Sequence, residues 1–530
     1  MLFCGRLRPL TIDIQLIKKW INICTNQHHR SCSVAAERGK RIVEPVKLIR
    51  FIDVRNDCIR TIPEASLQSI EYICLSYVWG QGQTTSLSKA SKTELSRPEA
   101  LVKKALPQTI TDAVHLTRLL KIPYLWVDIL CVVQDDATDL DAQLDNMAKI
   151  YRLAMLTIIA LGDHANAGLP GLRPETRSFQ QECTEVVPPA GTRPGLSLLT
   201  TCREPSQRSG YWAYGAHEID VSTWNSRGWT LQERAVSRRN LIFAKEQLFW
   251  VCDGGFFCEE SALEHPQLGT VVSEFDTPLR FEPFFDGVSA TRMKNITAPL
   301  AYNATSTERL WYRYSLLVQD YSRRTFTYLG DVHDAFRAIS QSFMEISGSS
   351  FHWGHPHSRF ESSLLWGAIS CRSALRRRTE MTTLPSTSLE TRATIPSWSW
   401  MGWVGPVNFN VANDRLECEN PMISCFIHQS NPLAITSIAH SARCGHNPGP
   451  MENLKPTPEA ILNEPPITLK DIEGNFPRLS ESRLKTIPSY HILFFWAQAA
   501  NFIVKSPERF PSPHTFYSKE WKDFGVAHME

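Results

Sequence analysis

Segments of strand length alternate with segments of helix length between residues 72 and 162, and this alternation restricts the fold more than any other feature of the sequence. The strand-length segments are YICLSYVWG (72–80), YLWVDILCVVQDD (124–136) and MLTIIALG (155–162). Between them, apolar residues recur at helical spacing after Pro107 and again over residues 140–154. The nearly continuous apolar character of residues 124–136 is typical of a strand that is buried on both faces. Strand, helix, strand, helix, strand predicts an α/β unit with a parallel sheet.

Further elements are expected on both sides of this unit. An amphipathic helix and a polar, basic linker are predicted for residues 1–45, and a strand for residues 48–54. Residues 163–223 are rich in proline, glycine and polar residues, which predicts a long irregular insertion. The later expectations are a helix from about Ser226, a hairpin over 240–252 that closes on Lys245 and Glu246, aromatic-rich helical segments beyond 270, a strand and loop at 396–405, an unpredictable region at 411–488 and a buried strand at 492–504.

Composition limits the class of protein. A chain of 530 residues is too long for one ordinary core, so two or more domains are expected. The formal net charge of +2 argues against nucleic acid and acidic membrane surfaces as partners. The amino terminus lacks the apolar core of a secretory signal, and the 14 cysteines are scattered without a CxxC pair. Residues 492–504 are too short to span a bilayer. These features predict a soluble, cytoplasmic protein with reduced thiols and no membrane span.

Metal sites and standard catalytic motifs find little support. The sequence contains no GxxxxGK, HExxH or GxSxG motif, and the GQG at 80–82 lacks the third glycine of a phosphate-binding fingerprint. HWGHPH at 352–357 contains three imidazoles but no neighbouring carboxylate or thiol to complete a metal site. Cys24, His28 and Cys32 are spaced for one face of a helix as well as for a metal, so packing is favoured there. The acidic residues from Asp135 onward fit a capped helix start better than a calcium loop. No metal is predicted.

Three polar clusters stand at the ends of expected elements. They are Ser76, Tyr77, Trp79 and Gly80 after a strand, Asp128 within an apolar strand, and Arg227, Trp229, Gln232 and Glu233 on a helix. A carboxylate such as Asp128 is costly in a buried strand unless it is paired, and Arg227 is a candidate partner in a structural ion pair. Open α/β sheets also bind ligands beyond the carboxyl ends of their strands. The residues alone therefore leave a structural cluster and a binding site equally open.

Four of these stretches together resemble the fungal heterokaryon-incompatibility (HET) domain. YICLSYVWG, YLWVDILCVVQDD, MAKIYRLAMLTIIAL and NSRGWTLQERAVSRRNLIF occur in the order and approximate spacing of that family. YSRRTFTYLGDVHDAF, FHWGHPHSRFESSLLW and PSWSWMGWVG are similar to segments that often follow the domain in large fungal HET proteins. The sequence departs from the family pattern at Ile129, Gln143 and His355, and Gln143 argues against a catalytic role for that position.

The resemblance implies a domain organisation and a fold. It implies an N-terminal helix and linker at 1–45, a HET domain at 46–262, an associated helical and aromatic region at 263–410, and a variable region at 411–530 that ends in a strand. The HET domain is similar to TIR domains, so the expected fold is a TIR- or flavodoxin-like parallel sheet flanked by helices, with an irregular insertion and a mixed α+β C-terminal region. The implied role is non-self recognition between fungal strains, a form of innate immunity that triggers regulated cell death.

The TIR likeness also implies a site. SYVWG at 76–80 resembles the first-strand box of TIR domains, and WTLQE at 229–233 resembles their Trp-x-x-x-Glu pattern, whose glutamate is catalytic in members that cleave NAD. Glu233 is then the candidate catalytic carboxylate, Trp79 or Trp229 a stacking ring, and Arg227 a phosphate ligand. The alternative is that Glu233 pairs with Arg227 or Arg234 and only holds a helix.

Two classes of function follow from the same residues. One is a nucleotide-cleaving enzyme with NAD as substrate and no certain cofactor. The other is an adaptor or scaffold that acts through homotypic assembly or with other incompatibility and recognition proteins. Under either reading, residues 75–80 are expected to line a site that faces residues 227–233.

Overall fold

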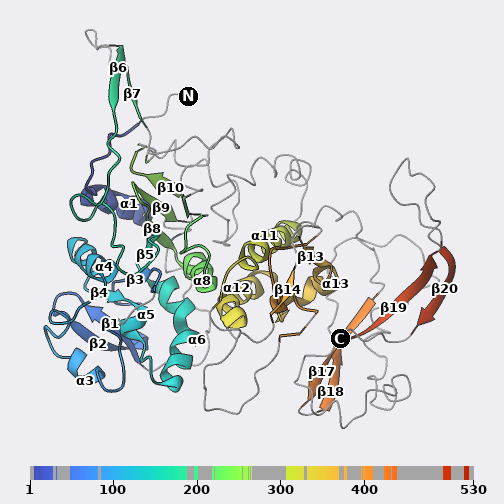
Figure 1. Ribbon diagram of the computed structural model, residues 1–530. Coiled ribbons are helices and arrows are strands. Elements are labelled where there is room, and N and C mark those ends of the chain that lie inside the picture. The colour runs from blue at the N-terminus through green and yellow to red at the C-terminus, as the bar shows by residue number, and fades with distance from the viewer. Residues whose placement is uncertain are drawn as a thin grey trace. The chain divides into compact units, whose positions relative to one another are not determined.

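Figure 1 shows the computed structural model of the chain. The structure describes residues 5–27, 32, 48–80, 85–187, 196–200, 218–219, 221–252, 255–260, 262, 264, 306–326, 331–368, 375–378, 395–396, 398–409, 423–430, 433–437, 493–502 and 518–524. The chain forms two compact units. The first comprises Met1–Thr305, Arg324–Thr327 and Asp334–Ser342, and the second comprises Ser306–Arg323, Tyr328–His333 and Phe343–Glu530.

An eight-stranded sheet forms the centre of the first unit. Its strands are β1 (Leu48–Asp53), β2 (Cys58–Pro63), β3 (Tyr72–Ser76), β4 (Tyr124–Trp126), β5 (Leu156–Ala160), β8 (Arg239–Phe243), β9 (Leu248–Cys252) and β10 (Gly255–Cys258). They lie in the order β10-β9-β8-β5-β3-β4-β1-β2. Strands β8, β5, β3 and β4 are parallel, whereas the pairs toward both edges are antiparallel. The predicted α/β unit with parallel strands is therefore confirmed for the centre of a mixed sheet.

The order of the parallel strands reverses at β3. Along the chain the parallel strands follow in the order β3, β4, β5, β8. In the sheet their order is β4, β3, β5, β8, because β4 and β5 pair with opposite sides of β3. Such a reversal opens a crevice at the carboxyl ends of the strands, where ligands bind in open α/β sheets. The register places Ser76, the last residue of β3, beside Ile159 of β5. The motif that ends β3 thus lies where a ligand crevice is expected.

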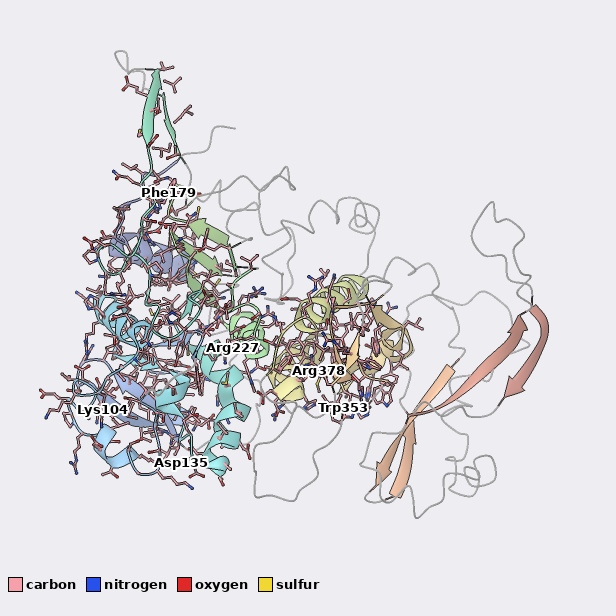
Figure 2. The ribbon with its side chains drawn as sticks, viewed as in Figure 1. Lys104, Asp135, Phe179, Arg227, Trp353 and Arg378 are labelled. Carbon is pink, nitrogen blue, oxygen red and sulfur yellow. The ribbon has the colours of Figure 1, made fainter. Side chains whose placement is uncertain are left out.

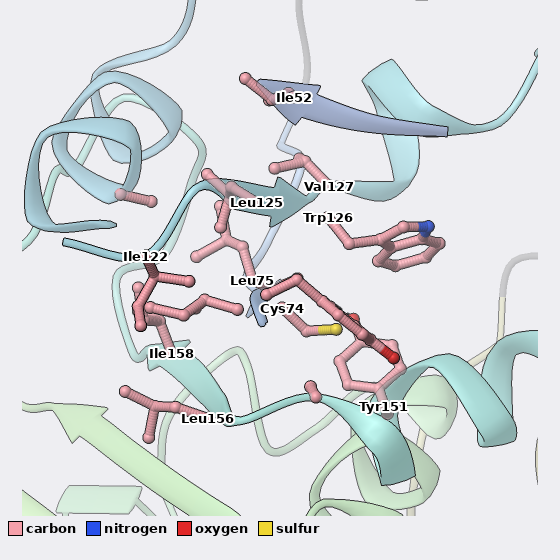
Figure 3. Packing of buried hydrophobic residues seen from close by; sticks show 14 of the residues in the cluster. Ile52, Cys74, Leu75, Ile122, Leu125, Trp126, Val127, Tyr151, Leu156 and Ile158 are labelled. Carbon is pink, nitrogen blue, oxygen red and sulfur yellow. Dashed lines mark hydrogen bonds between the residues drawn. The ribbon is translucent and has the colours of Figure 1, made fainter. Parts of the chain in front are cut away.

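Three helices connect the parallel strands. They are α4 (Gln108–Leu119), α6 (Ala137–Leu153) and α8 (Gly228–Val236). Figures 1 and 3 show α4 on one side of these strands and α6 on the other, and α6 packs against α8. Asp136 stands at the N-cap of α6 and Asp139 in its first turn, as the acidic segment predicted, where carboxylates complement the helix dipole. Helices on both faces leave β3, β5 and β8 fully buried.

The core of this unit is apolar on both sides of β3. Figure 3 shows Ile52, Leu75, Leu125 and Ile158 packed together around the parallel strands. The ring of Trp126 meets the ring of Tyr151 edge-on, with centroids 5.5 Å apart. Both rings are buried, and the Tyr151 hydroxyl donates a hydrogen bond to Leu75 O at 3.1 Å. The core therefore fixes α6 against the carboxyl half of β3.

The predicted N-terminal helix is present as α1 (Ile14–Asn26). The Asp13 carboxylate accepts hydrogen bonds from the amides of Gln15 and Leu16, which caps its first turn. Trp20 is fully buried and meets Trp250 of β9 with ring centroids 6.4 Å apart. The helix thus packs its apolar face against the β9 side of the sheet.

The prediction of one long strand over residues 124–136 is wrong. β4 ends at Trp126, and Asp128–Cys131 form a helical turn, α5. Ile129, Leu130 and Cys131 are nevertheless buried, so the continuous apolar pattern records burial and not extended backbone. The Arg50 guanidinium donates to Cys131 O at 2.8 Å, which satisfies a carbonyl at the end of the turn. Asp128 consequently begins a helical turn at the end of β4 and does not lie within a strand.

The other elements of the first unit agree with expectation more closely. The strand at 48–54 is β1, and the hairpin at 240–252 is formed by β8 and β9. The helix expected from Ser226 begins two residues later, at Gly228. In the described part of the insertion at 163–223, an antiparallel hairpin forms from β6 (Cys183–Val187) and β7 (Leu196–Leu199). A short helix, α3 (Lys92–Leu95), follows β3.

The helices expected beyond residue 270 are represented by α11 (Ser306–Tyr321), α12 (Asp331–Ser347) and α13 (Phe360–Leu364). The later strands are β11 (Phe351–His352), β12 (His355–Pro356), β13 (Trp366–Ala368), β14 (Arg376–Arg377), β15 (Trp403–Val404), β16 (Val407–Phe409), β17 (Ile423–Ser430), β18 (Leu433–Ser437), β19 (Leu493–Phe502) and β20 (Ser518–Phe524). β19 is the strand predicted at 492–504, and it belongs to a sheet of order β18-β17-β19-β20. Among the described residues, no helix is long and apolar enough to cross a membrane.

Aromatic side chains form the core of the second unit. The buried ring of Tyr314 lies 5.3 Å from that of Trp311 and 5.6 Å from that of Phe409, measured between centroids. In the HWGHPH segment, His355 is fully buried and its Nδ1 shares a hydrogen bond of 2.8 Å with Ser363 Oγ. Burial lowers the pKa of His355 to about 3, so its imidazole is neutral and packs as a core side chain.

Truncating the ring that joins β4 to α6 tests this account of the core. We expect Trp126→Ala to lower the free energy of unfolding of the first unit by about 3–5 kcal/mol, because it removes a buried ring and leaves a cavity. Val102→Ala is the control, because 67% of the Val102 side chain is exposed. Urea denaturation measures the free energy of unfolding, and hydrogen-exchange mass spectrometry of β3 and β5 shows whether the change lies in the first unit. A loss below about 1 kcal/mol for Trp126→Ala would contradict the packing described.

Candidate functional site

A buried chain of hydrogen bonds closes the carboxyl end of β3. The Trp224 indole donates through Nε1 to Ser76 Oγ at 2.7 Å, and Ser76 Oγ in turn donates to Glu233 Oε2. Trp224 is 0%, Ser76 1% and Glu233 7% exposed, so the whole chain is shielded from bulk water. Ser76 ends β3 and Glu233 lies on α8, which the sequence separates by more than 150 residues. The fold therefore joins two of the predicted polar clusters through one serine.

The position of Glu233 is fixed from the helix side as well. Its carbonyl accepts a hydrogen bond of 2.6 Å from Ser237 Oγ, and Ser237 Oγ lies 2.7 Å from Thr157 Oγ1 on β5. α8 is thereby held to β5 through Ser237 and to β3 through Ser76. Glu233 is thus held through its backbone carbonyl and through its carboxyl group, and a residue held in this way is preorganised, since little of its geometry is left to rearrangement.

Burial raises the pKa of Glu233 to about 7. The hydrogen bond from Ser76 lowers this pKa, and so do the positive charge of Arg227 and a hydrogen bond from Tyr151. The negative charge of Asp128 raises it further. Near neutral pH the group therefore exists in both protonation states. A carboxyl group with a pKa near the working pH can serve as a general acid or a general base.

Asp128 provides a second carboxyl group at the same edge of the sheet. It is half-buried, and its Oδ2 accepts from Trp79 Nε1 at 2.8 Å while its Oδ1 accepts from the amide of Ile129 at 2.8 Å. Burial raises the pKa of Asp128 to about 6, against the effect of both hydrogen bonds and of the Arg227 charge. Two carboxyl groups with raised pKa values at one edge of a sheet are a pattern found at functional sites.

Arg227 stands at the N-cap of α8 with a half-buried side chain. Its Nη1 donates to Tyr77 O at 3.2 Å, and it lowers the pKa of both carboxyl groups through its charge. Among the described residues, no ion pair within 4.0 Å joins Arg227 to Asp128 or to Glu233. The structural ion pair that the sequence suggested for Asp128 is therefore replaced by the indole of Trp79.

The backbone around Arg227 is held by a strap of later sequence. Arg324 Nη1 donates to Arg227 O at 3.0 Å, and the amide of Gly228 donates to Thr325 O at 3.0 Å. A Cβ atom on Gly228 would lie 1.8 Å from Cε1 of Phe326, so only glycine fits beneath that ring. This packing sets where α8 begins and hence where the Arg227 side chain starts.

The remaining predicted residues lie near the hydrogen-bonded chain or pack around it. Tyr77 is buried, and burial raises the pKa of its hydroxyl well above the usual range. Gly80 has φ +76°, a left-handed conformation that favours glycine. Trp229 is half-buried against the core, whereas Gln232 is buried and its Oε1 accepts from the amide of Ala338 at 3.4 Å. Gln232 thus contacts the backbone of α12 and supports the site from outside the hydrogen-bonded chain.

Two members of the site were not predicted. Trp224 was part of no polar cluster, and Tyr151 was assigned to the apolar face of a helix. The only signal for Trp224 in the sequence is an aromatic residue placed among polar ones just before the helix that carries Glu233. Nothing in the spacing of Tyr151 distinguishes it from a core residue. His28, once considered as a metal ligand, lies outside the described residues.

Comparison with known proteins places these residues inside a known domain. Residues 72–233 match the family model described as heterokaryon incompatibility protein (HET). A curated relative, "Heterokaryon incompatibility protein 6, OR allele" of Neurospora crassa, is 32% identical over 112 residues, which are 20% of this chain and 16% of the relative. No solved structure matches the chain significantly.

The matched region begins at the first residue of β3 and ends at Glu233. It therefore contains every residue of the hydrogen-bonded chain between Ser76 and Glu233, together with Asp128 and Arg227. On this ground we identify residues 72–233 as a heterokaryon-incompatibility (HET) domain.

Proposed function

We propose that the chain acts in fungal heterokaryon incompatibility as a TIR-like effector that cleaves NAD and thereby causes regulated cell death. The observation that carries the proposal is the buried Glu233 carboxyl group, with a pKa of about 7, at the carboxyl end of the strand where the sheet order reverses. The names of the matching family and relative support the incompatibility role. Because the chain covers only 16% of that relative, the role of the whole protein is part of the proposal.

The strand order supports the TIR- or flavodoxin-like part of the proposal. The parallel strands follow β4-β3-β5-β8, which corresponds to 2-1-3-4 in chain order. Flavodoxin-like sheets share this order, and they bind their nucleotide cofactor beside the first and third strands. Here those strands are β3 and β5, and Ser76 and Ile159 are register partners between them.

The residues fit the cleavage of a nicotinamide glycosidic bond. As the bond between the ribose C1′ and the ring nitrogen breaks, nicotinamide leaves with the electron pair and positive charge develops on the ribose. An ionised Glu233 stabilises that charge, and a water molecule then adds at C1′ and gives its proton to a carboxylate. In this proposal Arg227 holds a phosphate, and Trp79 or Trp229 stacks on a ring.

A second function is favoured by the same burial. Glu233 is only 7% exposed and already receives a hydrogen bond from Ser76, which suits a structural carboxyl group as well as a catalytic one. In that case the domain acts as an adaptor, through assembly with itself or with other incompatibility proteins. The two functions differ in whether NAD is consumed.

Replacing the carboxyl group separates the two functions. We expect Glu233→Gln in the full chain, expressed in a fungal host, to reduce NAD loss about 100-fold or more and to restore growth, because the amide keeps the hydrogen-bond acceptor but cannot ionise. Glu182→Gln is the matched control, because Glu182 is exposed in the insertion. NAD content and colony growth are measured together, with soluble protein level as the check on folding. Toxicity that persists in Glu233→Gln without NAD loss would support the adaptor and reject the enzyme.

The raised pKa of Glu233 also predicts how stability changes with pH. The ordinary pKa of a glutamate is 4.5 and that of folded Glu233 is about 7, so the folded state binds the proton more tightly. Stability from this group is present at low pH and is lost as pH rises through about 7, and Asp128 adds an effect of the same sign. We expect the urea midpoint of the first unit to fall between about pH 5 and about pH 8, and to fall less in Glu233→Gln. An equal fall in both proteins would contradict the assignment, with Glu182→Gln as control.

A further inference from the structure

Three cysteines of the first unit meet at one point, two from its N-terminal part and one from the end of β9. Cys24 lies on α1, Cys252 ends β9, and Cys32 lies eight residues after Cys24. Their sulfur atoms all lie within 4.8 Å of one another. Cys24 and Cys32 are fully buried, and Cys252 is half-buried. Cysteines that only fill space in a core have no reason to gather three sulfur atoms, so this group is a candidate for a shared ligand.

A guanidinium group accompanies the three sulfur atoms. Arg239, the register partner of Cys252 on β8, donates through Nε to Cys24 Sγ at 3.0 Å. Its Nη2 donates to Cys32 O at 3.1 Å, and Arg238 Nη1 donates to the same carbonyl at 3.4 Å. The arginines thus hold both the sulfur of one cysteine and the backbone of another. Such outer hydrogen bonds orient the ligands of metal sites.

We propose that Cys24, Cys32 and Cys252 bind one zinc ion, with Arg239 as the charge partner of the site. Thiolates are preferred ligands of Zn²⁺, and Zn–S bonds of about 2.3 Å in tetrahedral geometry place the sulfur atoms about 3.8 Å apart. The observed limit of 4.8 Å is met by a contraction of about 1 Å, within reach of side-chain rotation. The fourth position takes a water molecule or another ligand, which enters past the half-buried Cys252.

The charges of this site balance. Three thiolates and one Zn²⁺ leave one net negative charge, and the Arg239 guanidinium next to Cys24 Sγ offsets it. Without a cation, hydrogen bonds with Cys24 and Cys32, together with burial, raise the pKa of the Cys252 thiol well above the usual range. Binding therefore exchanges protons for the metal ion, as is usual for cysteine sites.

The proposed zinc site has a structural role and does not include the residues around Glu233. Cys24 is carried by α1, whose Trp20 packs on Trp250 of β9, the strand that ends with Cys252. A zinc ion here fastens the N-terminal helix to the sheet through covalent-like bonds in addition to apolar packing. This inference rests on the cysteines alone and holds whether or not NAD is the substrate.

Metal analysis of the full chain tests the site. We expect protein purified under reducing conditions to carry about one zinc per chain, and Cys24→Ser, Cys32→Ser and Cys252→Ser each to weaken zinc binding at least about 10-fold. Cys58→Ser is the matched control, because Cys58 is buried but lies outside the group. Cobalt substitution should give sulfur-to-metal charge-transfer absorption that Cys58→Ser retains and the three other variants lose. Zinc content that is unchanged in all three variants would overturn the proposal.

A footprint on the unmodified protein covers the case in which a variant fails to fold. With zinc bound, Cys24, Cys32 and Cys252 should resist alkylation, and a chelator should expose them together and lower the melting temperature by about 5 °C. Cys183 is exposed and should react in both states. Reduced protein that binds no zinc, or oxidation of two of the three thiols to a disulfide with no metal bound before it, would reject the site.

Discussion

The hydrogen bond from Ser76 to Glu233 is the interaction on which the arrangement of the HET domain depends. It joins the last residue of the central strand to the helix that precedes β8, and Trp224 supports it from the other side. A carboxyl group this deeply buried must be hydrogen-bonded or neutral, because an isolated buried charge is very costly. One serine therefore satisfies the carboxyl group and also holds α8 to the end of β3.

The elements that could be predicted are those whose pattern has a single structural solution. β3, β5, α4 and α6 follow from period and length, and the parallel pairing follows from their alternation. The prediction of one strand over residues 124–136 was wrong because a buried helical turn and a buried strand share the same apolar composition. Ile129, Leu130 and Cys131 are all buried, so no residue in that run carries the information that the backbone turns after Trp126.

Four members of the site were predictable, but their contacts and the parts taken by Trp224 and Tyr151 were not. Ser76, Asp128, Arg227 and Glu233 are polar residues where elements end, and residue chemistry singles them out. Which of them meet depends on the strand order, and the predicted pair of Asp128 with Arg227 gave way to the indole of Trp79. The cysteine group shows the same limit more sharply. Spacing connects Cys24 with Cys32, but only the fold brings Cys252 to them from the far end of β9.

The charges at this site bear on the proposed reaction itself. The negative charge of Asp128 raises the pKa of Glu233, and Arg227 is the cation whose charge lowers the pKa of both carboxyl groups. In the proposed reaction the nicotinamide ring of NAD, which carries a positive charge, enters beside Glu233 and favours the ionised carboxylate through the same Coulomb attraction. Nicotinamide becomes neutral on leaving, but the ribose then carries the positive charge and keeps the carboxylate ionised through the step that needs it. Under this proposal the substrate's own charge converts a buried carboxyl group with a pKa of about 7 to its ionised, reactive form. Burial, which makes Glu233 a stable part of the fold, also strengthens that attraction.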